Sequence, residues 1–279
     1  MIVKDWDKLP QELQIEEVRP YYDILKKHSV GLFFKRMFDI VVSSVMLIVL
    51  SPVFLILAIA IKLDSPGPVF YRQVRVTQYA KTFRIFKFRS MVSNADKIGT
   101  QVTVGNDSRI TRVGKLIRKC RLDELCQLID IFRGTMTFVG TRPEVSKYVA
   151  SYTPEMMATL LLPAGVTSEA SILYKDEDEL LEGAEDPDMV YVKQVLPEKM
   201  KYNLQAIKNF SFFGDIKTMF RTVTAVLGKE EYGEYLADQS LCSTAHLLPL
   251  SPPNLFCQAF NGDGASGYHL CRQHSAQLR

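Results

Sequence analysis

A hydrophobic run from Phe38 to Ile61 carries a Ser51-Pro52 pair near its middle, and this run constrains the fold more than any other feature. About 20 mostly apolar residues suffice for a helix to cross a bilayer, and Asp39 is the one charged residue in the run. Pro52 removes a backbone donor and clashes with the carbonyl one turn earlier, and it disfavours helical geometry at Ser51. We therefore expect either a kinked span or two half-helices that enter and leave through the same leaflet.

Basic residues flank both ends of the apolar run. Lys26, Lys27, Lys35 and Arg36 precede or open it, and Lys62 starts a longer basic stretch after it. Such residues favour the cytoplasmic side and anionic headgroups. Positive charge on both flanks favours a re-entrant anchor over a span. The alternative is a conventional span with its N-terminus outside, which an impermeant cysteine reagent would label.

Composition sets wide bounds. The chain has 279 residues with 47% hydrophobic content, which fits one ordinary domain plus appendages and excludes disorder of the whole chain. A net charge of +3 argues neither for nor against nucleic acid. The apolar run starts too far from Met1, without a small-residue cleavage site, to be an ordinary signal peptide. The five cysteines show no metal-ligand spacing, so we expect a reduced, cytoplasmic body.

Four segments follow from these patterns: a polar, partly helical lead (1–30), the membrane anchor (31–62), a body (63–228) and a tail (229–279). Aromatic and β-branched residues predict strands at Val69–Val76 and Thr82–Phe88. Helical periodicity predicts five helices in the body, at Ser108–Lys119, Leu122–Phe132, Pro154–Leu162, Val190–Asn209 and Asp215–Leu227. The expected fold class is α+β and mostly helical, a small cytoplasmic domain on a helix broken at Ser51-Pro52.

The tail differs in kind from the body. It holds three of the five Cys and three of the four His, and it is rich in Ser, Pro and Gly without periodicity. Its Cys and His spacings fit no common zinc pattern. We expect a disordered or non-native appendage and no metal.

Two adjacent carboxylates, Asp123 and Glu124, follow a cluster of cations that includes Arg118. On a helix, neighbouring side chains point about 100° apart, so the two can reach different atoms of one small site. One carboxylate can serve as nucleophile while the other binds a divalent ion, and nearby cations hold phosphate oxygens. The simpler interpretation is a charged helix start, because acids in the first turn suit the helix dipole.

Two further basic features are candidate phosphate ligands. Arg142 lies in a Gly/Pro-bounded turn and can present its planar fork to phosphate, although a structural turn with a solvated Arg is the alternative. Lys87 lies in a segment of alternating basic and aromatic residues, Lys81–Arg89. That pattern can indicate binding of nucleic acid, but beside a membrane anchor it favours contact with lipid headgroups. The alternative is a plain strand with two half-buried faces.

Several short motifs also occur in a fixed order along residues 30–228. They are Lys35-Arg36-Met37-Phe38-Asp39, Ser51-Pro52, Gly67–Gln73, Phe86–Met91, Arg109–Gly114, Leu122–Leu128 and Gly134–Pro143. In this order and spacing the chain resembles the bacterial sugar transferases, the monotopic phosphoglycosyl transferases that start glycan assembly on a polyprenyl phosphate.

The resemblance implies a specific reaction. The family moves sugar-1-phosphate from a UDP-sugar to undecaprenyl phosphate and releases UMP, which starts capsule, exopolysaccharide or O-antigen assembly at the cytoplasmic face of the bacterial inner membrane. Its re-entrant break matches Ser51-Pro52. Its Asp-Glu dyad matches Asp123 as the nucleophile that forms a covalent phosphosugar and Glu124 as the Mg²⁺ ligand. Arg118 and Arg142 match active-site arginines.

The sequence departs from the family pattern at three positions. Cys126 and Thr141 stand where the family usually has Pro, and Leu162 stands where it often has a basic residue before Pro-Gly. A phosphate-binding cation at the last position is therefore in doubt, with Lys175 as a substitute candidate. We expect these departures to affect substrate choice.

The expected partners are a UDP-sugar, undecaprenyl phosphate and membrane lipids. A homodimer is possible. No nucleic acid is expected, because nucleic-acid binding is the weakest of the alternative functions. The main alternative function is a non-catalytic anchored scaffold that binds anionic lipid through its basic face. The sequence does not name the sugar.

Overall fold

The computed structural model describes residues 3–95, 107–174 and 186–226. The described residues all belong to one compact unit, Met1–Glu230, and the other unit, Glu231–Arg279, lies outside them. The expected tail (229–279) and Lys175 therefore also lie outside the described residues. Within them the fold is α+β and mostly helical, as expected, with two small sheets.

The N-terminal lead is part of the core. It forms two 3₁₀ turns, η1 (Trp6–Lys8) and η2 (Gln11–Leu13), and helix α1 (Arg19–Lys27). Its acidic residues face solvent, whereas Leu13, Val18 and Leu25 are fully buried against η6 (Glu155–Leu161) and α10 (Leu196–Lys208). Burying apolar side chains is the main favourable contribution to folding. The segment that the sequence predicted to be a polar lead therefore stabilises the body.

The hydrophobic run forms two helices, α2 (Ser29–Val49) and α3 (Ser51–Asp64), bent by 60°. The interruption falls at Leu50, one residue before the expected site, and Ser51 already opens α3. Since Pro52 has no amide hydrogen, the Ile48 carbonyl loses its usual helical donor, and the Ser51 hydroxyl donates to it instead at 2.8 Å. Neither helix is by itself both long and apolar enough to cross a bilayer, whereas the bent pair together has the length and composition to do so.

Helix α2 turns several polar side chains toward the body and many apolar side chains outward, although Leu32 is fully buried. Lys35, Asp39 and Ser43 are buried on the face toward the body. The outward face exposes a continuous apolar set: Val30, Phe33, Phe34, Met37, Val41, Val45, Ile48 and Val49. Lys35 was expected to flank the membrane in contact with headgroups, and that expectation is wrong, because it is an internal ion-pair partner.

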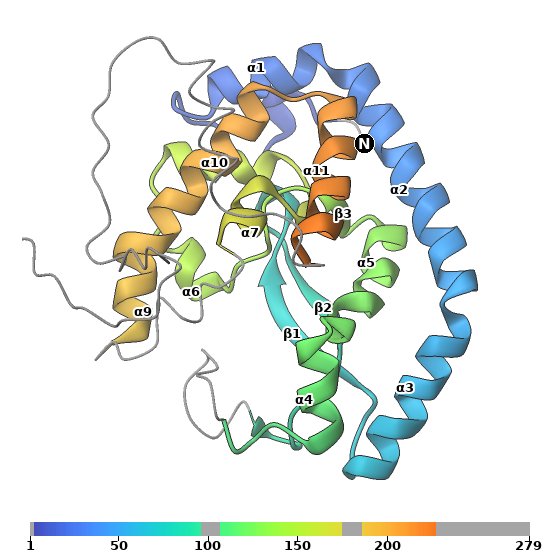
Figure 1. Ribbon diagram of the computed structural model, residues 1–279. Helices are drawn as coiled ribbons and strands as arrows, with labels where there is room; N and C mark the ends of the chain where they lie inside the picture. The colour runs from blue at the N-terminus through green and yellow to red at the C-terminus, as the bar shows by residue number, and fades with distance from the viewer. Residues whose placement is uncertain (1–2, 96–106, 175–185, 227–279) are drawn as a thin grey trace, which may run out of the picture. The chain divides into compact units, whose positions relative to one another are not determined.

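Two small sheets lie on the inner side of this bent pair (Figure 1). Strands β1 (Phe70–Val76) and β2 (Thr82–Phe88) confirm the two expected strands and pair as an antiparallel hairpin, joined through the 3₁₀ turn η3 (Gln78–Ala80). Strands β3 (Met136–Val139) and β4 (Ala164–Thr167) pair in parallel. The β4 strand follows the segment Pro154–Leu162 that the sequence predicted as a helix, at a place where no strand was expected.

The remaining helices surround these strands. In chain order they are α4 (Arg112–Lys119), η5 (Leu122–Gln127), α5 (Leu128–Arg133), α6 (Ser146–Val149), α7 (Glu169–Leu173), α9 (Pro187–Val190), the π-helical turn η7 (Tyr191–Val195) and α11 (Phe212–Val226). The expected helix Leu122–Phe132 is instead a 3₁₀ segment followed by a short α-helix. Phe132, an apolar residue that an amphipathic helix would be expected to bury, is 50% exposed. The expected helix Pro154–Leu162 is likewise 3₁₀.

Candidate active site

The carboxylate pair lies just after a sharp turn between α4 and η5. Arg121 takes a left-handed conformation at φ 54° and ψ 22°, which ends the basic helix and starts the 3₁₀ segment that carries Asp123 and Glu124. A non-glycine residue in this region is uncommon and worth about 1–2 kcal/mol of strain. Packing of η5 on β2 holds the turn in place.

Glu124 is held by two cations from different parts of the chain. Arg142 grips both carboxylate oxygens, with Nη2 on Oε1 and with Nη1 at 3.3 Å from Oε2, and Lys87 Nζ lies 3.1 Å from Oε1. Burial works to raise the pKa of the Glu124 carboxyl, but Arg142 and Lys87 together outweigh it and lower that pKa well below its usual value. Glu124 is therefore ionised throughout the physiological range.

Asp123 has the opposite electrostatic balance. Burial raises the pKa of its carboxyl above the usual aspartate value, Lys87 opposes the rise, and the neighbouring Glu124 carboxylate adds to it. Two adjacent carboxyls whose pKa values are displaced in opposite directions are typical of sites in which the two groups have different roles. Here Glu124 is a fixed anion and Asp123 is a more basic carboxyl.

Both carboxylates line one pocket of about 430 Å³. It brings together all five residues that the sequence predicted for the chemistry, namely Lys87, Arg118, Asp123, Glu124 and Arg142. Lys119 and Arg121 add further positive charge, which suits a ligand with concentrated negative charge. Sequence reasoning missed three lining residues, Ser171, Tyr174 and Lys199, which lie in α7, at its C-terminal end and in α10.

Arg142 owes its position to a close contact between two strands. Gly140 N donates to Thr167 O at 2.9 Å, and Gly165 N donates to Thr141 O at 2.8 Å. A Cβ on Gly165 would come within 2.2 Å of the Gly140 backbone, so glycine is required there. The backbones at Gly140 and Gly165 approach this closely because Gly165 lacks a side chain; a Cβ on Gly140 would be tight as well, 3.1 Å from Pro163 O, and the chain then continues into Arg142.

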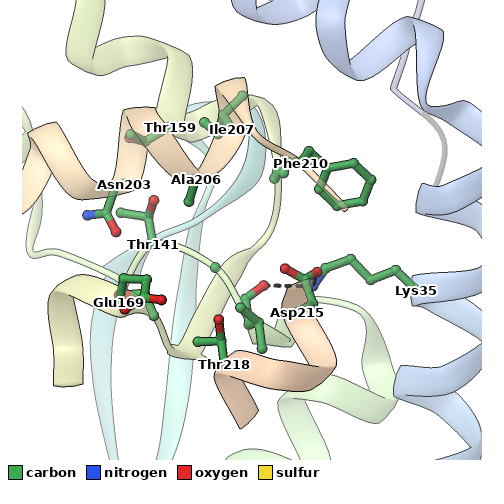
Figure 2. A pocket seen from close by; sticks show the side chains of 14 residues that line it. Lys35, Thr141, Thr159, Glu169, Asn203, Ala206, Ile207, Phe210, Asp215 and Thr218 are labelled. Atoms are coloured by element: carbon green, nitrogen blue, oxygen red, sulfur yellow. Dashed lines mark hydrogen bonds and ion pairs between the residues drawn. The ribbon is translucent and has the colours of Figure 1, made fainter. Parts of the chain in front are cut away.

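Helix α2 contacts the same segment from the other side. Lys35 Nζ donates to Val139 O at 2.8 Å and pairs with Asp215 at 2.6 Å, and Thr137 Oγ1 donates to Asp39 at 2.8 Å. Figure 2 shows the Lys35–Asp215 pair at the edge of a second, smaller cavity of about 60 Å³, which Thr141 also lines. Ser51 and Pro52 lie in the helix bend and do not line the larger pocket. The apolar helix pair is thus joined by hydrogen bonds to the strand that leads into the site.

The donor set fits a divalent cation of the kind that bridges protein and substrate. No group of three His, Cys, Asp or Glu side chains with metal-ligand geometry occurs in the described part of the chain. Mg²⁺ typically takes one or two carboxylates and completes its shell with water and phosphate oxygens. Glu124 Oε2 accepts only the longer Arg142 contact, and a carboxylate oxygen has a further lone pair to offer.

The departures at Cys126 and Leu162 are explained locally. Cys126 is 1% exposed, and its Sγ donates to the Asp123 carbonyl at 3.4 Å, so a thiol hydrogen bond supports the turn that carries the nucleophile candidate. Burial raises the pKa of this thiol and keeps it protonated. Leu162 packs against the core cluster beneath the N-terminal lead and does not line the larger pocket.

The sequence of this chain matches a known protein family and several known proteins. A family model described as bacterial sugar transferase matches residues 30–229. A UDP-N-acetylgalactosamine-undecaprenyl-phosphate N-acetylgalactosaminephosphotransferase of Aeromonas hydrophila is 35% identical over 198 residues, which is 70% of this chain and 44% of that protein.

Two further relatives extend the comparison. A UDP-glucose:undecaprenyl-phosphate glucose-1-phosphate transferase of Escherichia coli is 35% identical over 218 residues, covering 76% of this chain and 44% of that protein. The exopolysaccharide production protein ExoY of Rhizobium meliloti is 30% identical over 212 residues, covering 71% of this chain and 87% of that protein. The chain thus spans less than half the length of the first two relatives and most of the third.

Proposed function

This chain belongs to the bacterial sugar transferase family, and on that basis we propose that it transfers sugar-1-phosphate from a UDP-sugar to undecaprenyl phosphate and releases UMP. The names of the Aeromonas and Escherichia relatives support both substrate classes. The name of the Rhizobium relative supports a role in exopolysaccharide production. The product would start assembly of a capsule, exopolysaccharide or O-antigen.

The observation that carries the proposal is the contrasting state of two neighbouring carboxyls in one cationic pocket. Asp123, with its raised pKa, is the nucleophile: a carboxylate oxygen attacks the β-phosphorus of the donor, the bond to the bridging oxygen breaks, and UMP leaves with that oxygen. A phosphate oxygen of undecaprenyl phosphate then attacks the same phosphorus and frees the Asp123 carboxylate. Arg118, Lys119 and Arg121 surround the diphosphate charge that would otherwise repel an anionic nucleophile.

Glu124 is the residue that would hold Mg²⁺. Its lowered pKa keeps it anionic, and Arg142 and Lys87 fix its orientation. When bound, the ion would neutralise oxygens of the diphosphate. Arg142 and Lys87 also lie in reach of the same pocket, so each can turn to phosphate once the donor enters.

The α2–α3 pair is the proposed membrane anchor. Both helices expose many apolar side chains, and α2 buries Lys35, Asp39 and Ser43, which is the reverse of a water-facing helix, and such a surface indicates contact with lipid. The bend of 60° at Leu50 supports a re-entrant hairpin at the cytoplasmic leaflet rather than a straight crossing. An anchored site meets its lipid acceptor along a surface, which raises the effective concentration of the acceptor phosphate.

The test is UMP release by the purified protein with undecaprenyl phosphate and Mg²⁺ across UDP-glucose, UDP-galactose and their N-acetylated amino analogues. The proposal expects release with at least one donor, loss of release in Asp123→Asn, and weakened use of Mg²⁺ in Glu124→Gln, seen as a higher Mg²⁺ concentration needed for release. The rival scaffold function expects no release with any donor and no metal dependence. Turnover that persists in Asp123→Asn would refute the assigned nucleophile.

A further inference from the structure

The active-site pocket has a second wall that phosphate chemistry does not account for. Ser171, Tyr174 and Lys199 line it together, and we call these three residues the α7–α10 wall. Ser171 lies in α7 and Tyr174 caps the C-terminal end of that helix, three residues on, so both project from one side of α7. The Tyr174 ring packs edge-on against Tyr202 of α10, with centroids 6.4 Å apart.

Lys199 is the most enclosed member of the α7–α10 wall. Lys199 is 5% exposed. Its Nζ donates to Tyr191 Oη at 3.3 Å and lies 5.2 Å from the centre of the Tyr191 ring. Tyr191 in turn donates to Glu144, two residues after Arg142. Tyr191 begins the π-helical turn η7, and such turns often occur at functional sites. A buried ammonium is therefore positioned in the pocket before substrate arrives.

We propose that the α7–α10 wall binds the glycosyl group of the donor and selects among sugars, with Lys199 as its main hydrogen-bond donor. This proposal rests on the proposed function. Two hydroxyls and an ammonium suit the hydroxyl and acyl oxygens of a sugar. A uracil base instead needs a flat apolar slot, and the α7–α10 wall offers one aromatic ring that already packs on Tyr202.

The reaction order supports the same assignment. The sugar-1-phosphate stays on Asp123 from the departure of UMP until the lipid acceptor attacks. The side chains that bind the sugar must therefore keep their contacts through both steps. UMP must leave between them. An enclosed side chain such as Lys199 suits the part of the donor that is retained, and the open, cationic side of the pocket suits the part that departs.

The test compares Lys199→Met with Lys201→Met, a matched control two residues on in α10 whose exposed ammonium pairs with Glu198. For each variant the KM for UDP-sugar and the inhibition constant of UMP are measured, together with kcat/KM across the four donors of the UMP-release screen. Lys199→Met should raise the KM roughly tenfold to a hundredfold, the range expected for loss of a charged hydrogen bond. It should leave UMP inhibition within about twofold of the wild type and change the ranking of donors. Lys201→Met should change none of these.

A parallel rise of the UMP inhibition constant would overturn the proposal, because it would assign the α7–α10 wall to the nucleotide. An unchanged KM in an active enzyme would overturn it as well. If Lys199→Met does not fold, Ser171→Ala and Tyr174→Phe each remove one hydroxyl, and at least one must raise the sugar-donor KM without changing UMP inhibition. No UMP release by the wild type with any donor would overturn the proposed function, and this proposal with it.

Discussion

The buried Lys35–Asp215 pair joins the proposed anchor to the catalytic body, and Lys35→Met tests what that connection contributes. In the structure the ammonium serves two acceptors, the Asp215 carboxylate at 2.6 Å and the Val139 carbonyl at 2.8 Å. The Lys35 side chain is 4% exposed and that of Asp215 is 22% exposed. Removing the ammonium leaves both acceptors without their donor in a place that water reaches only in part.

The expected cost follows from this burial. Breaking a buried ion pair by deleting one partner costs about 3–5 kcal/mol. Because Asp215 keeps some contact with water, we expect the lower end, about 3 kcal/mol of unfolding free energy. In Lys35→Met/Asp215→Leu the Asp215 charge is no longer stranded, so we expect much of that loss to be recovered, with about 1 kcal/mol or more remaining from the unpaired Val139 carbonyl and from the buried Asp39, which also loses the nearby ammonium.

Denaturant unfolding in detergent micelles measures these free energies, and UMP release measures the effect on the site. Val139 lies three residues before Arg142, so kcat should fall further than the loss of folded protein explains. Lys201→Met serves as the control. A loss of unfolding free energy below about 0.5 kcal/mol in Lys35→Met would contradict the account. A loss in the double variant equal to the sum of the losses in Lys35→Met and Asp215→Leu would contradict it as well.

Three further predictions follow from other features of the structure. Burial raises the Asp123 pKa and only the ionised carboxylate attacks, so kcat/KM should fall with decreasing pH at a higher pH than an ordinary aspartate would give, and an acid limb at the ordinary aspartate pKa or below it would contradict this. Gly165→Ala should cost about 1–3 kcal/mol of stability and lower kcat, because its Cβ would meet Gly140 at 2.2 Å. The control Gly214→Ala, which meets only Ser211 at 3.5 Å, should not lower either in thermal melts and UMP release. Pro52→Ala restores an amide donor and should open the 60° bend, so spin labels at Val45 and Ile59 should lie farther apart than in the parent, and an unchanged distance would contradict this.

Local chemistry made much of this molecule predictable. Proline geometry predicted a break at Ser51-Pro52, which the structure has one residue earlier at Leu50, and aromatic and β-branched residues predicted the strands β1 and β2. The five residues expected to carry chemistry, from Lys87 to Arg142, line one pocket, and their charge together with their match to the family motifs made them predictable. Their roles remain predictions.

The misses have physical causes as well. The pairing of β3 with β4 is a parallel contact between four-residue strands far apart in sequence, and it depends on two glycines whose partnership no local pattern reveals. The 3₁₀ segment η5 begins after Arg121 in a left-handed conformation, which residue type does not predict. Ser171, Tyr174 and Lys199 are common residue types at ordinary spacings, so tertiary packing alone brings them to the pocket.

Intact-mass analysis of the protein incubated with a UDP-sugar and Mg²⁺, without lipid acceptor, tests the central claim most directly. The account predicts an added mass equal to one sugar-phosphate, absent in Asp123→Asn and discharged when undecaprenyl phosphate is supplied. An adduct that survives in Asp123→Asn, or UMP release by the wild type without any adduct that the acceptor can discharge, would contradict it.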